Sequence, residues 1–332
     1  MFDKVVIITK ETQLEQLVRQ FSTKDQAKFY IEQSQKSYRA KVKQSKNTGD
    51  EQRGSGDDTI RFSVIEEADS VYRESLRRVR SAIPQEIKVQ HIDWSFLPNF
   101  LFGEQDLIVA LGQDGLVVNI AKYLGSQPIV AVNPDPQQYD GVLLPFTAET
   151  ARRRLPSILQ GEFDAAPISI ARASLDDGQE LYGVNDIFIG PKSHISFRCT
   201  VEFGGQREDQ SSSGIIVSTG CGSTGWFKSI IEGARRITSG YDEQGPGEKS
   251  SRFSWDSNYL YFSVREPFSS RVSGTGITFG KITEDDPLII TSHMADRGII
   301  FSDGIEQDYL EFNSGRIATV ALADRKARLV KG

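Results

Sequence analysis

The sequence predicts an α/β domain with a parallel sheet, followed by an all-β domain. Up to about residue 147, short apolar runs typical of buried strands alternate with segments that carry apolar residues at helical spacing. Beyond that point, strand patterns separated by turn signals follow one another with few helical interruptions. A chain of 332 residues is long enough for two separate cores. We therefore expect domains at residues 1–147 and 148–332, with a ligand cleft between them.

The elements expected in the first domain alternate between strand and helix. The expected strands are residues 4–8, 87–92, 106–111 and 129–132, and the expected helices are residues 11–45, 65–83 and 116–123. Pro84 ends the second helix, and the polar, glycine-rich residues 46–58 are interpreted as a mobile loop. Strands that alternate with helices favour a parallel sheet covered on both faces, which binds ligands at the carboxyl ends of its strands.

The second domain is expected to begin with a short helix at residues 149–159. The strands expected after it are residues 167–175, 186–189, 196–203, 214–218, 260–264, 277–279, 288–291, 299–302 and 317–322. The sequences at 176–178 (Asp-Asp-Gly) and 204–205 (Gly-Gly) are typical of hairpin turns. A second helix should follow residue 224, and residues 241–251 are interpreted as an exposed loop.

Composition narrows the partners that the protein could have. A net charge of −6 and a pI near 5.3, with no evident basic face, argue against nucleic acid as the main partner. No apolar stretch is long enough to cross a bilayer, so we expect no membrane association. The two cysteines form neither a disulfide framework nor a zinc pattern. Because the N-terminus enters a strand at once, leaving no room for a leader peptide, we expect a cytoplasmic protein.

Two loops of small residues carry the chemical signal. They are Gly112-Gln113-Asp114-Gly115 and residues 218–226 (Ser-Thr-Gly-Cys-Gly-Ser-Thr-Gly-Trp), and each follows an apolar strand. A strand that enters a glycine-bearing turn and then a helix directs backbone N–H groups at one point, which favours phosphate binding. Asp114 would repel phosphate there unless it accepts a proton from a hydroxyl or contacts a metal ion. The pair of loops therefore predicts phosphoryl transfer to an alcohol.

The order of these motifs along the chain resembles that of the NAD kinase family. The family pattern is matched by the Gly112–Gly115 loop, the pair Asn185-Asp186, the loop at 218–226 and Asp303-Gly304, collinear from about Val5 to about Val320. The chain is most similar to the mitochondrial-type branch, through residues 132–136, 212–214, 262–267 and 311–315. The Asp-Gly loop alone is shared with phosphofructokinases and diacylglycerol-type lipid kinases, whereas the ordered set is specific.

The resemblance implies a fold, a reaction and an assembly. The fold is NAD kinase/diacylglycerol kinase-like, with a Rossmann-like N-terminal α/β domain and a C-terminal β domain. The reaction transfers the γ-phosphoryl group of ATP, with Mg²⁺ or another divalent metal, to the 2′-hydroxyl of the adenosine ribose of NAD, giving NADP. The protein would be a homodimer or homotetramer with NAD and ATP as substrates.

The resemblance also assigns site residues. Asp114 would be the general base that takes the proton of the ribose hydroxyl. The NAD-binding residues would be Asp114, Gly115, Asn185, Asp186, Ser213, Thr224, Gly225 and Trp226. The residues that bind ATP or phosphate would be Gly112, Gln113, Gly115, Gly222 and Ser223, and no metal ligands are assigned.

The chain departs from the family pattern at four positions. Gln113 replaces the second glycine of the first loop, and Asp186 replaces the usual glutamate. Ser213 stands where many bacterial members carry aspartate, and Cys221 stands where a hydroxyl residue is usual. With Gln113 in view, a catalytically weak regulatory relative that binds NAD or NADP is an alternative function. A superfamily kinase acting on a lipid or sugar is another.

Each motif also has a purely structural interpretation. Asp114 could be a turn aspartate that stabilises a strand–helix junction. Asn185-Asp186 could be an ordinary turn before a strand. The loop at 218–226 could be a helix cap built of small residues, and Cys221 could be an inert small residue.

Overall fold

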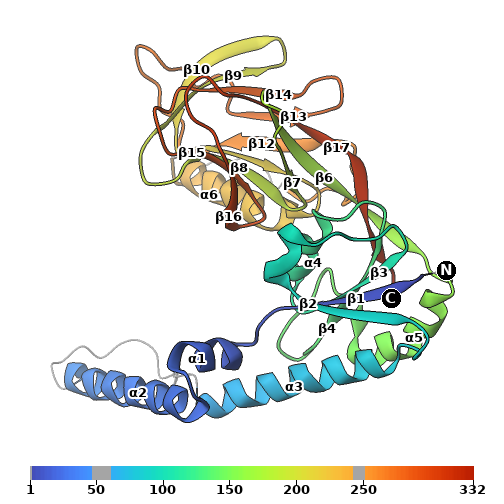
Figure 1. Cartoon of the computed structure of the whole chain (residues 1–332). Helices are drawn as coiled ribbons and strands as arrows, with labels where there is room; N and C mark the ends of the chain where they lie inside the picture. The colour runs from blue at the N-terminus through green and yellow to red at the C-terminus, as the bar shows by residue number, and fades with distance from the viewer. Residues whose placement is uncertain (1, 47–60, 242–250) are drawn as a thin grey trace.

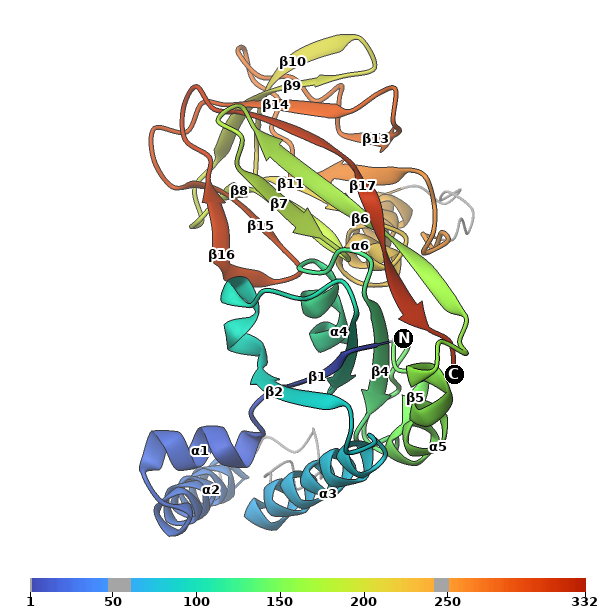
Figure 2. The ribbon, with the colours of Figure 1, turned by 45° about the vertical axis from the view of Figure 1, so that its right-hand side comes forward.

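The computed structural model describes residues 2–46, 61–241 and 251–332, shown in Figures 1 and 2. The α/β unit contains the parallel strands β1 (Lys4–Thr9), β2 (Lys88–Asp93), β3 (Asp106–Leu111) and β4 (Pro128–Asn133), in the order β4-β3-β1-β2. The short strand β5 (Phe146–Thr147) pairs with β4 in parallel. Every residue of β3 and β4 is buried, because helices cover both faces of this sheet.

Helices on opposite faces of the parallel sheet complete two cores. On one face, α3 (Phe62–Ser81) and α5 (Ala148–Leu159) pack against β1, β3 and β4. On the other face, α4 (Asp114–Ala121) packs together with the 3-10 helix η1 (Trp94–Asn99). The α/β class predicted from the sequence is thus confirmed. The domain boundary at residue 147 stays a prediction, and since α5 packs in the core of the parallel sheet, we propose to group it with the first unit.

A helical arm extends from the α/β unit. A single helix was expected at residues 11–45, and this prediction is wrong. The segment forms two helices, α1 (Gln13–Phe21) and α2 (Lys24–Lys46). The chain breaks at Ser22, whose φ of 69° is incompatible with a right-handed helix. In both views α1 and α2 lie at one end of α3, away from the sheet (Figures 1 and 2). Of the two predicted loops, residues 47–58 and 242–250 lie outside the described residues.

The second unit is an antiparallel β structure, as predicted. Its strands are β6 (Ala165–Leu175), β7 (Glu180–Gly183), β8 (Asp186–Pro191), β9 (Phe197–Phe203), β10 (Gln206–Ser212), β11 (Ile215–Ser218), β12 (Leu260–Val264), β13 (Phe279–Ile282), β14 (Leu288–Ser292), β15 (Gly298–Ser302), β16 (Ile305–Glu311) and β17 (Ile317–Val330). The 3-10 helix η2 (Gly222–Thr224) and α6 (Trp226–Tyr241) follow β11. The hairpin turns predicted at 176–178 and 204–205 are confirmed, connecting β6 to β7 and β9 to β10 with glycines at positive φ.

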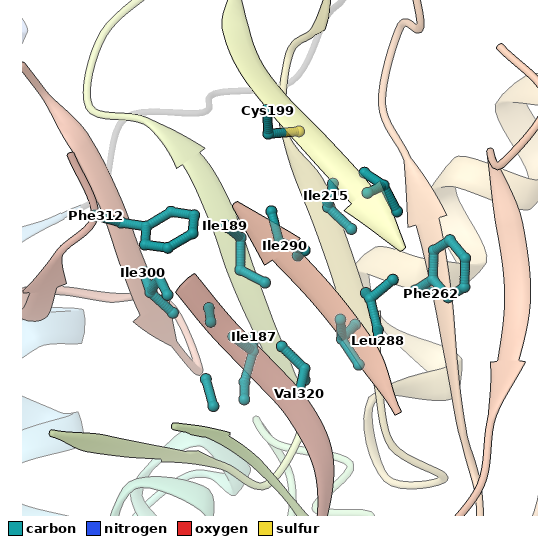
Figure 3. Packing of buried hydrophobic residues seen from close by; sticks show 14 of the residues in the cluster. Ile187, Ile189, Cys199, Ile215, Phe262, Leu288, Ile290, Ile300, Phe312 and Val320 are labelled. Carbon is teal, nitrogen blue, oxygen red and sulfur yellow. The ribbon is translucent and has the colours of Figure 1, made fainter. Parts of the chain in front are cut away.

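Two sheets of the second unit enclose its core. A six-stranded sheet has the order β13-β12-β11-β8-β15-β16, and β9, β14, β17 and β6 belong to the other sheet. Figure 3 shows the side chains between them, with Ile187 and Ile189 of β8 facing Leu288 and Ile290 of β14. This packing buries the strand β8 that follows Asn185.

The last strand joins the two units. β17 pairs with β6 along most of its length, and near its end Arg328 and Leu329 pair in parallel with Pro128 and Ile129 of β4. One 11-stranded sheet therefore runs through both units, and both views show the chain ends near each other (Figures 1 and 2). The sequence predicted only residues 317–322 as strand, so this connection is a finding of the structure. No helix among the described residues is long and apolar enough to cross a membrane.

Candidate functional site

The first motif loop lies at the carboxyl end of β3. Gly112 follows the strand, Gln113 takes the N-cap position, and Asp114 begins α4. A Cβ at position 112 would lie 2.8 Å from Cδ2 at the far end of the Leu116 side chain, which would have to shift to accept it. A Cβ at Gly115 would meet nothing within 4 Å, so the fold itself leaves room at this exposed position.

The Asp114 carboxylate is held by the backbone of a neighbouring loop. Its two oxygens accept hydrogen bonds from the N–H of Leu143 at 2.7 Å and the N–H of Val142 at 3.2 Å. Both donors lie in the segment that follows β4. A carboxylate has about four lone-pair positions, so two remain for a further donor. The contact thus orients the Asp114 carboxylate and leaves it able to accept a further hydrogen bond.

The second motif loop is built on close backbone contacts. The Thr219 N–H donates to the carbonyl oxygen of Asn185 at 3.0 Å. A Cβ at Gly222 would lie 2.1 Å from that same carbonyl oxygen, and a Cβ at Gly220 would lie 1.8 Å from the carbonyl oxygen of Ser254. The hydroxyl of the buried Ser223 donates to the carbonyl oxygen of Gly220 at 2.6 Å. Ser223 therefore stabilises the loop. Because Gly220 and Gly222 lack a Cβ, the loop can lie directly against the backbone of Ser254 and Asn185.

Asp303 holds the Asn185-Asp186 pair in place. Its carboxylate accepts hydrogen bonds from the N–H groups of Asn185 at 2.7 Å, Val184 at 3.0 and 3.1 Å, and Asp186 at 3.3 Å. In return, the Asp303 N–H donates to the carbonyl oxygen of Asp186 at 3.0 Å. Asp303 lies in the turn between β15 and β16, with a φ of 54° in the left-handed region. The sequence analysis noted Asp303-Gly304 as a motif but did not include Asp303 among the site residues.

Buried carboxylates at this point have altered acidity. Burial, together with the charge of Asp303, raises the pKa of Asp186 to about 7. Burial raises the pKa of Asp303 to about 6, although the N–H groups of Val184 and Asn185 partly oppose this. The Asp186 side chain is 8% exposed and makes no hydrogen bond to any described residue. It is therefore a buried carboxyl group whose partner is not supplied by the described part of the protein.

The thiol of Cys221 lies where these segments meet. Burial raises its pKa to about 12, with smaller contributions from the negative charges of Asp303 and Asp114. The first loop, the second loop and the Asp303 turn thus act on one buried atom. Because the thiolate is the reactive form of cysteine, this high pKa favours the interpretation of Cys221 as an inert small residue.

A cavity of about 490 Å³ opens beside the first loop, at the carboxyl ends of β1, β3 and β4. Gly112, Gln113 and Gly115 line it. Lys10 is the only cationic side chain among the described residues of its lining, and its Nζ lies 5.0 Å from the centroid of the Trp94 ring. Of the lining carboxylates, Asp69 and Glu11 are ion-paired with Arg73 and Arg19. The sequence analysis missed Lys10, for which the only signal was its position directly after a strand.

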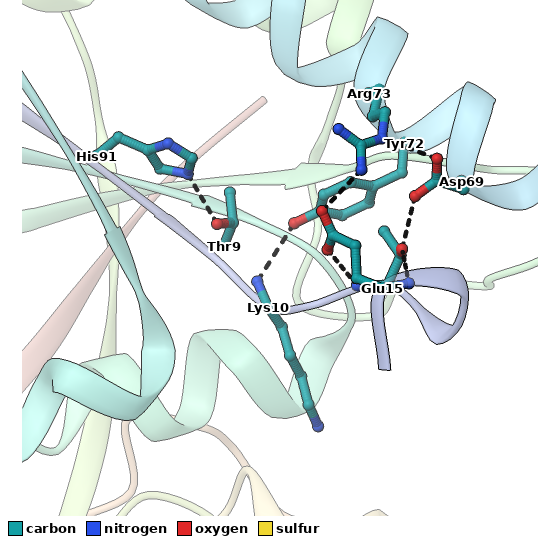
Figure 4. Close-up of polar contacts among 8 residues, drawn as sticks. Thr9, Lys10, Glu15, Asp69, Tyr72, Arg73 and His91 are labelled. Atoms are coloured by element: carbon teal, nitrogen blue, oxygen red, sulfur yellow. Dashed lines mark hydrogen bonds and ion pairs between the residues drawn. The ribbon is translucent and has the colours of Figure 1, made fainter. Parts of the chain in front are cut away.

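Figure 4 shows how the rim of this cavity is held together. The Tyr72 hydroxyl of α3 accepts a hydrogen bond from the Lys10 N–H at 3.3 Å and donates to the carbonyl oxygen of Leu111 at 2.9 Å. Burial raises the pKa of Tyr72, so the hydroxyl remains a donor. Tyr72 therefore connects the ends of β1 and β3 next to the Gly112 loop. In Figure 4 the Lys10 side chain extends away from the Tyr72 ring.

A second cavity, of about 510 Å³, lies on the β unit. Ser213 and Trp226 line it, and the Trp226 ring stacks on Phe188 with centroids 5.8 Å apart. The Arg265 guanidinium lies over the same indole ring, 5.4 Å from its centroid. This flat, cation-flanked surface suits an aromatic ligand.

The predicted site residues thus fall into four groups. Gly112, Gln113 and Gly115 line the first cavity, and Ser213 and Trp226 line the second. Asp114 acts on the Cys221 thiol, and Asn185 and Asp186 are held by Asp303. Gly222 lies against the Asn185 carbonyl oxygen, and both Gly222 and Ser223 are buried. Thr224 and Gly225 are exposed at the end of the second loop, directly before Trp226.

Among the described residues, no group of three or more histidine, cysteine, aspartate or glutamate side chains could hold a metal ion.

The fold is that of the NAD kinases. No family model matches the sequence, and no curated protein matches it. Among solved structures, yeast NADH kinase complexed with NADH is similar with a TM-score of 0.59 and 12% identity, covering 100% of this chain and 84% of that one. An NAD kinase from Archaeoglobus fulgidus in complex with ATP is similar with a TM-score of 0.51 and 19% identity, covering 79% and 89%. At such identities the likeness establishes the fold, and the mitochondrial-type branch stays a prediction.

Proposed function

We propose that this protein is an NAD kinase, which transfers the γ-phosphoryl group of ATP to the 2′-hydroxyl of the adenosine ribose of NAD and yields NADP and ADP. The observation that carries the proposal is the placement of Asp114. Its carboxylate is fixed by two backbone N–H groups at the start of α4, beside a cavity lined by the Gly112 loop. The Asp303 carboxylate of the β unit and the Asp114 carboxylate both act on the buried Cys221 thiol, and Asp186 is buried beside Asp303.

The proposed chemistry follows from these positions. A ribose hydroxyl is a weak nucleophile, and a carboxylate within hydrogen-bond reach accepts its proton as the new O–P bond forms. At the start of α4 the Leu116 N–H donates to the carbonyl oxygen of Gln113 at 2.9 Å. The N–H groups of Asp114 and Gly115 have no such partner among the described residues, so they are available to phosphate oxygens. Asn185 and Asp186 offer an amide and a carboxylate that match ribose hydroxyls and the adenine edge.

A divalent cation would bind this site together with the nucleotide. Because the described residues provide no preformed set of three ligands, Mg²⁺ would be held mainly by triphosphate oxygens. Asp114 and Asp135 are the nearby carboxylates that could complete its shell, and Asp135 lines the first cavity. The cation would neutralise the charge that develops on the phosphates.

The direct test is an assay for NADP with purified protein, ATP, NAD and magnesium. We expect turnover in the wild type and a loss of at least about a hundredfold in Asp114→Asn, with NAD affinity within a few-fold. Asp177→Asn is a matched control, because Asp177 also accepts a backbone N–H, from Gln179 in the hairpin between β6 and β7. Near-normal turnover of Asp114→Asn would refute the assignment of the base.

A second substitution separates binding from catalysis. Asn185→Ala should chiefly raise the NAD concentration required, because its contacts are the same in the ground state and the transition state. An unchanged half-saturation for NAD would remove Asn185 from the substrate site.

A second candidate is a regulatory relative that binds NAD or NADP without turnover. The observation in its favour is Gln113, whose side chain is exposed and lines the first cavity in place of a glycine. Equilibrium binding of NAD measured beside turnover distinguishes the two, since the second candidate binds and does not turn over. Failure of both measurements would favour a kinase for a lipid or sugar.

The assembly is part of the proposal. As the resemblance implies, we propose a homodimer or homotetramer. Sedimentation velocity of the purified protein tests this, and a monomer at the concentration used in the assay would contradict it.

A further inference from the structure

The Asp303 carboxylate contacts the backbone of the Asn185-Asp186 pair at several points. It accepts N–H hydrogen bonds from three consecutive residues, Val184, Asn185 and Asp186. Three successive N–H groups that converge on one carboxylate fix the local backbone, and therefore the direction in which the following side chains leave it. The register of β8 with β15 (Ile187 opposite Ser302) brings Asp303 next to Asp186.

We propose that Asp303 is a positioning residue for nucleotide binding, which orients Asn185 and Asp186 toward the ribose hydroxyls of NAD. This inference rests on the proposed function, because it takes the Asn185-Asp186 pair as the NAD-binding pair. Asp303 acts through these two residues and needs no contact of its own with the substrate.

The surroundings of Asp186 show why its charge matters. The side chain is buried and lacks a hydrogen-bond partner among the described residues, so a ligand that donates O–H or N–H groups would supply one. Asp303 faces it from the β15–β16 turn. The Lys122 amine at the end of α4 acts on Asp303 and is paired with Asp308 of β16 at 3.1 Å.

Other groups near this pair come from three further segments of the chain. The Tyr123 hydroxyl, the Cys221 thiol and the Asp114 carboxylate all belong to the same electrostatic neighbourhood. Lys122 is the cation among these groups, so the ionised form of Asp186 lies among negative charges. A hydroxyl-bearing ligand prefers that ionised form, because only the carboxylate accepts at both oxygens.

The test substitution is Asp303→Gly. Because Asp303 has a φ of 54°, glycine takes this conformation without strain, and the variant removes the carboxylate while leaving the turn accessible. We expect the dissociation constant for NAD, measured by calorimetry, to rise by about tenfold or more, the effect of losing one hydrogen bond to a charged group. The dissociation constant for ATP should stay within about twofold.

Glu208→Gln is the matched control. The Glu208 carboxylate also accepts backbone N–H groups, from Gly276 at 2.8 Å and Ile277 at 3.2 Å, and it lies in the same β unit outside both cavities. Both variants should lose some thermal stability. Only Asp303→Gly should lose NAD affinity, which separates positioning from general destabilisation.

The pH dependence of NAD binding gives a readout that a structural role would not change. In the wild type, affinity should rise with pH as Asp186 ionises near pH 7. In Asp303→Gly the midpoint should move to lower pH, because the neighbouring negative charge is gone. The midpoint of Glu208→Gln should stay in place.

Two outcomes distinguish the possible failures. If the wild type binds NAD and a folded Asp303→Gly variant binds it equally well with the same midpoint, the role of Asp303 is refuted and the proposed function stands. If the wild type binds no NAD at all, the proposed function is refuted, and this inference with it.

Discussion

Gly222 lies against the carbonyl oxygen of Asn185, so closely that a Cβ at position 222 would be 2.1 Å from it. The obstacle is backbone, which cannot rotate away as a side chain does. Gly222→Ala should therefore destabilise the protein by about 2–4 kcal/mol. It should also weaken NAD binding, because it displaces Asn185.

Urea unfolding of the purified variants measures the first effect. Gly233→Ala in α6 is the control, since a Cβ there would meet nothing within 4 Å. Wild-type stability of Gly222→Ala would show that the loop at residues 218–226 is not held against Asn185 by this contact.

Substitution of Gly115 should not destabilise the protein, unlike substitution of Gly222. It is exposed at the start of α4, and the fold leaves space for a Cβ that would border the first cavity. Gly115→Ala should keep or slightly raise thermal stability, by up to about 1 kcal/mol from helix propensity. ATP affinity should fall about tenfold if the phosphates approach the backbone here. Calorimetry that finds ATP binding intact would place the phosphates elsewhere.

Gln113→Gly tests the main departure from the family pattern. The exposed Gln113 side chain lines the first cavity and makes no capping hydrogen bond. If it only obstructs ATP, the glycine variant should bind ATP more tightly and turn over faster. If it donates to a phosphate oxygen, affinity should fall by about tenfold. We expect an active wild type in either case, so an inactive wild type rescued by this substitution would favour the regulatory alternative.

Asp186 should make stability depend on pH. Its pKa is raised from the ordinary value to about 7, so the folded state binds a proton that the unfolded state releases between about pH 4 and 7. Its contribution to stability is therefore present at low pH and lost as pH rises through 7. Relative to the wild type, Asp186→Asn should be more stable at pH 8, on the order of 1–3 kcal/mol, with little difference at pH 4. A stability difference that is the same at both pH values would contradict this.

The sequence predicted well those elements whose buried residues form a recognisable pattern within the element itself. The strands β1, β3 and β4 are uninterrupted apolar runs, and α3 has a clear helical period ended by Pro84. The strands β5, β7, β10 and β16 were missed. β10 reads Gln-Arg-Glu-Asp-Gln-Ser-Ser and lies at a sheet edge, where polar residues face solvent and leave no strand pattern.

The sequence by itself determined the two motif loops and the chemical types at their centre, because glycine, small residues and Asp114 mark a strand-to-helix turn over a few neighbouring positions. Only the tertiary structure decided that Asp303 meets Asn185 across 118 residues, and that β17 returns to pair with β4. The physical reason is that such contacts depend on the register of strands far apart in the chain. The hydrophobic pattern along a strand indicates which of its faces is buried. Which other strand pairs with it is decided by the packing of the whole core.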